Sequence, residues 1–252
     1  AEYIHKITGD VDLLLTQFGY AAHIGDPDDV ELRKIASKEK LMRIKLQSNV
    51  FNSKYVIPFA SFIRFSHEDN IYMNDQVNKI GTVEEFIKQE TNSIPIILYP
   101  GDKWILGENN ENIKAIEFYE KDFAKKFEPF KNSPTIEFQE LQNYSNIYTK
   151  KIRDRNNWTL IKFFHSISFL KTAKIYLKDL DLSITFDLVH GINKSEFSKN
   201  ESDIIIDSDS LAFAFKFDYG ADTLLANARF HKSGGRTMIF FRQFMIGTLN
   251  NN

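Results

Sequence analysis

The sequence predicts an α/β domain followed by a smaller α+β domain. Residues 11–59 read in order as a strand, a long helix and a strand, which is the order of a parallel βαβ unit. From residue 134 onward, helices come first and alternating strands follow, a pattern typical of α+β folds. A charged, proline-bearing stretch at 107–135 separates these two patterns of predicted elements. We therefore place the first domain at residues 1–125 and the second at residues 134–252.

Two strands and a helix open the first domain. "YIHKI" and "VDLLLTQF" read as strands, and the continuous apolar run of the second predicts a buried strand. A loop rich in Gly, Pro and Asp leads to a helix over residues 29–50, with Asp28 as its cap and Glu31 in a capping-box relation. One helix face is expected to be apolar and to carry Ile35, Met42, Leu46 and Val50.

The rest of the first domain alternates strands and helices. "KYVIPF" is the strand that completes the βαβ unit, whose loops should lie at one edge of the sheet. "TVEEFIKQE" predicts a short helix, "IPIILY" a strand, and "PGDKWIL" a β-turn into another strand.

The second domain begins with two helices, "FQELQNYSNIYTKKIRD" and "WTLIKFFHSIS". "AKIYLKDLDLSITFDLV" alternates like half-buried strands, and "SDIIIDSDSLAFAFKF" reads as a strand, a turn and a helix. "DTLLANARF" is expected to be a strand, and "GGRTMIFFRQFMI" a closing helix.

Composition excludes several classes of function. The chain has 252 residues, a net charge of −2 and 42% hydrophobic residues, so packed cores are expected and no basic surface for nucleic acid is indicated. No apolar run approaches the roughly 20 residues of a membrane helix, and no signal peptide is visible, so we expect a cytoplasmic protein without membrane insertion. The absence of cysteine excludes disulfides and thiolate ligands. Because the chain starts with Ala and enters strand-like sequence at once, we expect it to be part of a longer protein.

The six histidines do not form a recognised metal motif. No two lie within five residues of each other, and neither H-x-H-x-D-H nor H-E-x-x-H occurs. We therefore expect no cofactor in this chain and name no catalytic residue, although ligands distant in sequence could still meet in the fold.

His67 is the histidine whose neighbours suit a metal. It stands beside Glu68, Asp69 and Asn70, and imidazole with oxygen ligands suits zinc or iron. The alternative is a solvated turn at the end of a strand. We keep His67 as a candidate metal ligand and Asn70 as a candidate for the rim of a substrate site.

His23 stands in a Gly/Ala loop that Asp26 follows. A histidine there could contact a substrate or transfer a proton, or the loop could merely precede the helix. We keep His23 and Asp26 as substrate-rim candidates. His165 lies among aromatic residues of an amphipathic helix, and we expect a structural role for it.

Phenylalanine is concentrated in the second domain. "KFFHSISF" and "LAFAFKFDY" could line an apolar ligand cavity or simply pack in the core, and a tunnel beneath Phe213, Phe215 and Phe217 would favour a ligand. "SGGR", at 233–236, could bind an anion through Arg236 or form a flexible lead into the last helix.

Four segments together carry a resemblance: "GDVDLLLTQFGYAA", "KEKLMRIKLQ", "KYVIPFASFIRFSHEDNIYMND" and "IILYPGDKWIL". In this order, over residues 8–107, they resemble the later half of a metallo-β-lactamase-fold domain, in the branch of CMP-N-acetylneuraminate hydroxylase and its bacterial relatives. The segment "SDIIIDSDSLAFAFKFDYGADTLLANARF" looks like the core of sterol-carrier-like domains, which line an apolar tunnel.

The resemblance implies the βαβ half of an αββα sandwich, with the loops at 18–27 and 59–75 facing a metal centre. His23 and Asp26 would then lie at the substrate rim and His67 near the metal. The clustered-histidine motif of the family belongs to the first half of its fold and is not in this chain, and Ala60 stands where hydrolytic relatives place a histidine. The Rieske cluster of the hydroxylase needs cysteines that this chain lacks.

These observations give two functional expectations. The first is that the chain is a fragment of a metal-dependent hydrolase or hydroxylase-like protein and is inactive alone. The full-length enzyme would use zinc or iron on a small-molecule substrate, with the missing N-terminal half as partner. The second is a non-catalytic module that binds an apolar small molecule or lipid in the aromatic-rich second domain.

Overall fold

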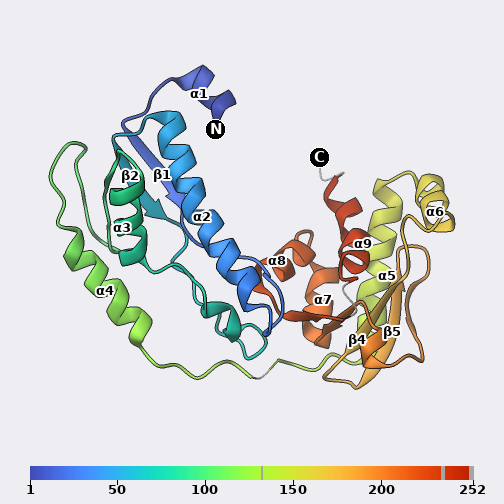
Figure 1. Cartoon of the computed structure of the whole chain (residues 1–252). Helices are drawn as coiled ribbons and strands as arrows, with labels where there is room; N and C mark the ends of the chain where they lie inside the picture. The colour runs from blue at the N-terminus through green and yellow to red at the C-terminus, as the bar shows by residue number, and fades with distance from the viewer. Residues whose placement is uncertain (132, 234–235, 250–252) are drawn as a thin grey trace. The chain divides into compact units, whose positions relative to one another are not determined.

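The computed structural model describes residues 1–131, 133–233 and 236–249 (Figure 1). The chain divides into two compact units. The first contains Ala1–Ser66 and Ile71–Pro129, and the second contains His67–Asn70 together with the chain from Phe130 onward. Both units combine helices with strands, so the molecule is mixed α/β, with one parallel and one mixed sheet. The sequence placed the boundary between residues 125 and 134 but did not anticipate that residues 67–70 belong to the second unit.

The elements of the first unit alternate in type along the chain. They are α1 (Glu2–Thr8), β1 (Leu13–Gln17), α2 (Val30–Phe51), β2 (Tyr55–Phe59), the short 3-10 helix η1 (Ile71–Asn74), α3 (Ile80–Glu90), β3 (Ile94–Pro95) and α4 (Asn112–Ala124).

The sheet of the first unit has the order β1-β2-β3, and all its strands are parallel. Leu13 pairs with Tyr55 and Gln17 with Phe59, and α2 is the crossover between these two strands. The predicted βαβ unit is therefore present. The loops that follow β1 and β2 leave from the same edge of the sheet, because both strands run in the same direction.

Two predictions for the start of the chain are wrong. "YIHKI" lies in helix α1, where Tyr3, Ile4 and Ile7 follow the helical spacing and are all exposed. The strand β1 exists, but it is an edge strand rather than a buried central one, and Leu15 is 50% exposed. An apolar run therefore identified the strand but not its burial.

Helix α2 has its predicted length, but the opposite face is buried. Ile35, Met42 and Leu46 are exposed. The buried positions are Arg33, Ser37, Ile44 and Ser48. The polar members of this set form hydrogen bonds to neighbouring loops, as Ser37 Oγ does to the carbonyl of Gln76, so hydrogen bonding rather than apolar character selects the inner face. The N-cap is Asp29, one residue after the predicted Asp28, and its side chain accepts the N–H of Asp26 instead of capping the helix.

The core of the first unit lies among the sheet and helices α3 and α4. Its buried side chains are Phe18, Ile44, Val56, Ile80, Val83, Ile87, Ile97, Ala115 and Tyr119. The predicted helix "TVEEFIKQE" is confirmed within α3, whereas the strand expected in "IPIILY" is reduced to Ile94–Pro95. "PGDKWIL" begins with a turn and has no strand, and Trp104 Nε1 donates instead to the carbonyl of Glu108.

The second unit contains most of its predicted elements. They are α5 (Phe138–Arg155), α6 (Trp158–Ser166), β4 (Ala173–Leu177), β5 (Leu182–Asp187), β6 (Gly191–Lys194), the 3-10 helix η2 (Lys199–Glu201), β7 (Ile204–Ile206), α7 (Ser208–Lys216), α8 (Gly220–Asn227), β8 (Phe230–Lys232) and α9 (Met238–Leu249).

The sheet of the second unit has the order β6-β5-β4-β7-β8. Strands β4 and β7 are parallel, and every other neighbouring pair is antiparallel. The carboxyl ends of β4 and β7 and the amino end of β8 therefore meet at one sheet edge. The predicted strands β4 and β5, the strand–helix pair β7–α7 and the closing helix α9 are confirmed, and β4 and β5 pair antiparallel. Gly234 and Gly235 of "SGGR" lie outside the described residues.

"DTLLANARF" is mainly helix, not strand as predicted. Residues Gly220–Asn227 form α8, and only Phe230 of this segment enters β8. The buried residues Ala221, Leu224 and Ala228 recur at helical spacing. A short apolar segment can carry either periodicity, and here tertiary packing selects the helix.

The core of the second unit is rich in aromatic rings. Phe215 packs on Tyr148, Phe186 and Phe244 with ring centroids 4.9–5.8 Å apart. Phe213 and Phe217 are 39% and 52% exposed and contact each other. The phenylalanines of "LAFAFKFDY" are thus divided between core and surface. Other aromatic rings occupy the space beneath Phe215, where a ligand tunnel had been considered.

Among the described residues, no helix combines the length and the apolar character that a membrane crossing requires.

Candidate functional site

His67, the predicted metal candidate, is part of a hydrogen-bonded turn in the second unit. Its Nδ1 accepts the N–H of Asp69 at 3.2 Å, and its Nε2 lies 3.3 Å from Ser133 Oγ. Burial, followed by the nearby Arg229 guanidinium, lowers the pKa of His67. The neutral ring therefore has hydrogen-bond partners for both nitrogens, and a metal-binding role for it stays a prediction.

Asn70 lies inside the same turn rather than at an open rim. Its Oδ1 accepts the N–H of His67 at 2.9 Å, and its Nδ2 donates to the carbonyl of Asn227 at 2.7 Å. The residue is 5% exposed. These contacts give Asn70 a positioning role for the His67–Asn70 turn.

His23 and Asp26 lie together in the first unit. His23 Nε2 is 3.6 Å from Asp26 Oδ1, and the His23 side chain is 4% exposed. Arg33 holds this loop in place, because its guanidinium donates to the carbonyls of Asp26 and Pro27. The same guanidinium forms a bidentate pair with Asp75. The structure thus pairs two of the candidates in the first unit and the other two, His67 and Asn70, in the second.

A buried ionic network at one sheet edge of the second unit includes Asp69. Lys178, which follows β4, donates to Asp69 Oδ1 and lies 3.2 Å from Asp207 Oδ2, which follows β7. Arg229, just before β8, pairs with Asp209 at 3.1 Å. The sheet topology brings these charges together from distant parts of the sequence, so no local sequence motif predicts the network.

The two carboxylates of this network differ in acidity. Burial raises the pKa of Asp207 to about 6, against the attraction of Lys178. Burial also acts on Asp69, but the nearby His231 and Lys178 outweigh it and hold the pKa of Asp69 well below its usual range. The network holds the His67–Asn70 turn in the second unit through charge pairing.

A different region of the second unit contains an apolar cavity of about 590 Å³ between α6 and α9. It is lined by Asn156, Asn157, Leu160, Ile161, Phe164, Phe169, Leu170, Met238, Arg242, Met245 and Ile246. The phenylalanine-rich segment "KFFHSISF" therefore contributes Phe164 and Phe169 to a cavity. No local pattern indicated that α9, more than 65 residues later in the chain, forms the other wall.

Arg242 is the charged residue in the lining of this cavity. Its guanidinium lies 6.0 Å from the centroid of the Phe169 ring, and no carboxylate of the described residues pairs with it. Asn157 Oδ1 accepts the N–H of Leu160 as the N-cap of α6, so the oxygen of that amide already has a partner. The cavity therefore combines apolar walls with one available cation.

The first unit has a larger cleft, of about 690 Å³, with a different character. Its walls are polar, and several of their side chains are paired with one another. Glu84 pairs with Lys88 and accepts Asn112 Nδ2 at 3.1 Å, and Asn112 also donates to the carbonyl of Pro95. Because these three side chains already have partners, they are less available to a ligand.

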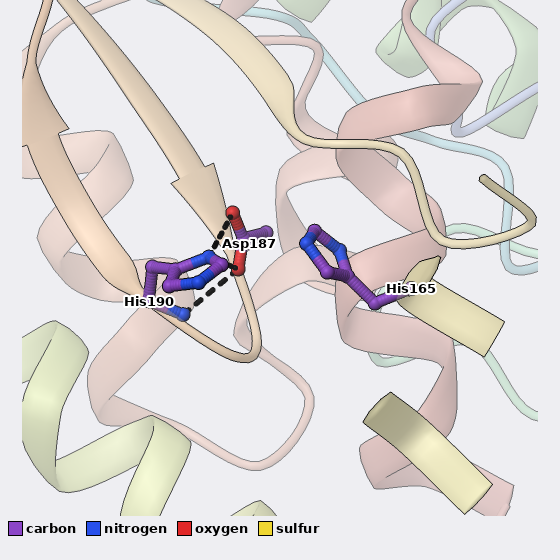
Figure 2. A group of neighbouring side chains, drawn as sticks. All are labelled: His165, Asp187 and His190. Carbon is purple, nitrogen blue, oxygen red and sulfur yellow. Dashed lines mark hydrogen bonds and ion pairs between the residues drawn. The ribbon is translucent and has the colours of Figure 1, made fainter. Parts of the chain in front are cut away.

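The second unit also contains a cluster of three potential metal ligands, His165, Asp187 and His190 (Figure 2). They come from α6, the end of β5 and the β5–β6 turn. One potential ligand atom from each lies within 4.8 Å of the others. A structural role was expected for His165 because it lies among aromatic residues of an amphipathic helix. Its partners stand more than 20 residues away in the sequence, so no local motif indicated the group.

No protein-family model, curated protein or solved structure matches this chain. The cavity and the charged groups described above are therefore the basis for a functional proposal.

Proposed function

We propose that the second unit binds an amphipathic small molecule, with an apolar chain and an anionic head group, in the cavity between α6 and α9. The observation that carries this proposal is the combination of an apolar cavity of about 590 Å³ with Arg242, a cation in its lining that has no acidic partner among the described residues. It corresponds to the second of the two expectations from the sequence.

The size and lining of the cavity support a small-molecule ligand. Pockets for such ligands have volumes of about 300–1,000 Å³ and are mainly apolar, with a few polar groups that fix orientation. Leu160, Phe169, Met238 and Met245 are between 48% and 57% exposed, which leaves apolar surface for a ligand to cover. Methionine side chains adapt to ligands of different shape, so a flexible alkyl chain fits this lining.

Arg242 supports an anionic head group. Guanidinium groups bind carboxylates and phosphates through two parallel hydrogen bonds. Since Arg242 lines the cavity and has no acidic partner among the described residues, a ligand carboxylate would supply that partner. A cationic head group would be repelled there.

The test is calorimetric titration of the chain with three ligands of equal tail length, each below its micellar concentration. These are dodecanoate, dodecan-1-ol and dodecyltrimethylammonium. Dodecanoate is expected to bind best and with a stoichiometry of one. Equal affinity for all three would contradict the anionic head group, and absence of saturable binding by any of them would contradict the proposal as a whole.

Two substitutions locate the binding. Leu160→Trp adds bulk inside the cavity and is expected to abolish binding, whereas Leu225→Trp, on α8 and 37% exposed, is the matched control and should leave it unchanged. Arg242→Gln should weaken dodecanoate binding about five-fold, as expected for a half-exposed charge pair worth up to about 1 kcal/mol. Dodecan-1-ol binding should not change, and Arg43→Gln serves as the control for charge.

A second candidate function concerns the first unit. The loops that follow β1 and β2 are hydrogen-bonded to each other: Phe18 N–H donates to Ser61 Oγ at 3.0 Å, and Tyr20 Oη donates to the carbonyl of Met73 at 2.6 Å. This common edge supports the proposal that the unit completes a metallo-β-lactamase-like centre of a hydrolase or hydroxylase-like enzyme. Its zinc or iron ligands would come from polypeptide outside this chain.

The coding sequence upstream of Ala1 tests that second candidate. A clustered-histidine motif of the form H-x-H-x-D-H in the same reading frame would support it. A stop codon directly upstream, or a long upstream sequence without clustered histidines, would contradict it.

A further inference from the structure

Three side chains of the second unit converge beside the β5–β6 turn, and neither proposal above uses them. Asp187 ends β5 and is 4% exposed, whereas the His190 side chain is 61% exposed. Figure 2 shows the ring of His165 pointing from α6 toward the Asp187 carboxylate and the His190 ring. The group is therefore fixed on its inner side and open to solvent on its outer side.

The carboxylate of Asp187 is held in place by its neighbours on both oxygens. Its Oδ1 accepts the backbone N–H groups of Val189 and His190 at 2.9 and 2.8 Å. Its Oδ2 accepts the hydroxyl of Thr172 at 2.9 Å. His190 Nδ1 lies 3.2 Å from the same Oδ2, so a metal at this oxygen would take the position that the His190 ring now occupies.

The two imidazoles each direct a nitrogen at this carboxylate region. His165 Nδ1 lies 3.0 Å from the carbonyl of Leu170, which can only accept, so the neutral tautomer that fits this contact has its proton on Nδ1 and its lone pair on Nε2. A backbone carbonyl that orients a histidine in this way is the usual outer partner of a metal-binding histidine. His190 Nδ1 lies 3.0 and 3.2 Å from the two Asp187 oxygens.

Gln243 of α9 holds the two segments of the group together. Its Nε2 donates to the carbonyl of Lys171 at 2.8 Å, and its Oε1 accepts the N–H of Leu188 at 3.2 Å. Gln243 is fully buried. This buried amide connects the segment after His165 with the turn that carries Asp187 and His190, so the group is held from behind by the core.

We propose that His165, Asp187 and His190 form a binding site for a divalent first-row transition metal, with Zn²⁺ as the defining probe. Two imidazoles and one carboxylate are an established ligand set for zinc and for non-haem iron, and water would complete the coordination at the open side. Ligand atoms at about 2.0–2.1 Å from a tetrahedral zinc lie about 3.3 Å from one another. The three potential ligand atoms lie within 4.8 Å of one another, so side-chain rotations suffice to bring them to that spacing. A neutral imidazole keeps one N–H, so a metal bound at His190 Nδ1 would take the place of the proton that this nitrogen shares with Asp187, and the ring would carry its proton on Nε2.

The experiment uses the whole chain, freed of metals with a chelator that is then removed. Zn²⁺ is titrated by calorimetry, and Co²⁺ is titrated with detection of its visible absorption, which reports the coordination geometry. One equivalent of each ion is expected to bind. His165→Gln and His190→Gln are each expected to weaken Zn²⁺ binding at least ten-fold and to change or abolish the cobalt spectrum.

His5→Gln is the matched control. His5 Nε2 also forms a 2.9 Å pair with a carboxylate, that of Asp10, but His5 belongs to the first unit and to no group of three potential ligands within the part of the chain that the structure describes. Circular dichroism establishes that each variant is folded. Absence of a one-to-one complex, unchanged affinity in both His165→Gln and His190→Gln, or equal weakening by His5→Gln would each overturn the proposal. Because dodecanoate binding is measured separately, this result and that of the cavity are independent.

Discussion

Lys178 is the side chain that neutralises the buried carboxylate of Asp69 in the second unit. Removing one partner of a buried ion pair leaves an uncompensated charge, which is far more costly than losing an exposed pair. Lys178 is 26% exposed and Asp69 6%, so the pair is mostly desolvated.

Lys178→Met is therefore expected to lower the free energy of unfolding of the second unit by about 2–3 kcal/mol. The control is Lys34→Met, which removes an exposed pair with Glu31 and should cost no more than about 0.5 kcal/mol. Urea unfolding followed by Trp158 fluorescence measures this in a Trp104→Phe background, because the chain has one tryptophan in each unit. Equal effects of the two lysine substitutions would show that the network does not stabilise the unit.

Asp207 gives a prediction about pH. Its pKa rises from an ordinary value of 3.8 to about 6 in the folded chain, so the folded state holds an additional proton between these values. The free energy of unfolding should therefore fall as the pH rises from 4 to 6, by on the order of 2–3 kcal/mol from this group. Asp207→Asn does not titrate and should lack that fall.

The same urea experiment, repeated between pH 4 and 7 in both proteins, measures the difference. His67, whose pKa is lowered, acts in the opposite direction, since its contribution is lost as the pH falls. That contribution is present in both proteins, so their difference isolates Asp207. Parallel pH profiles would mean that Asp207 titrates normally.

At the scale of single elements, the contact between α7 and α8 depends on a glycine. A Cβ at Gly220 would lie 2.4 Å from the carbonyl oxygen of Phe213 and 2.8 Å from Cα of Ala214. Both are backbone atoms, so the helices would have to move apart. Only glycine fits this approach.

Gly220→Ala should destabilise the second unit by about 1–3 kcal/mol, the usual cost of overpacking. Gly81→Ala, at the start of α3, is the matched control, because its Cβ would meet side chains at 3.5 Å and no backbone. That control is expected to be neutral or stabilising by up to about 1 kcal/mol, since alanine favours helix over glycine. Thermal unfolding by circular dichroism compares the two, and equal effects would contradict the close helix contact.

Long periodic elements could be predicted from the sequence, whereas short apolar ones could not. The 22 residues of α2 and the 18 of α5 were expected at their places. The segments of α1 and α8 were expected to be strands, because seven or eight residues fit both periods. The buried face of α2 was also wrongly predicted, because Arg33 is buried by hydrogen bonds that depend on the distant Asp75.

At the scale of the whole molecule, the mixed α/β class and the parallel order of β1 and β2 were predictable, and the binding sites were not. The cavity requires α6 and α9 to pack together, and the histidine–aspartate group requires a turn to meet a helix 20 residues earlier. Such contacts are set by tertiary packing and leave no local pattern. The aromatic segment around Phe164 was the one local signal of the cavity, and it did not reveal Arg242.

The central claim is that a ligand occupies the cavity between α6 and α9, and the four methionines of the chain allow a direct test. Met238 and Met245 line the cavity, whereas Met42 and Met73 belong to the first unit. With ¹³C-methyl methionine, NMR titration with dodecanoate is predicted to shift the Met238 and Met245 signals saturably and to leave those of Met42 and Met73 unchanged. Shifts of similar size at the exposed Met42, or none at Met238 and Met245, would contradict the account.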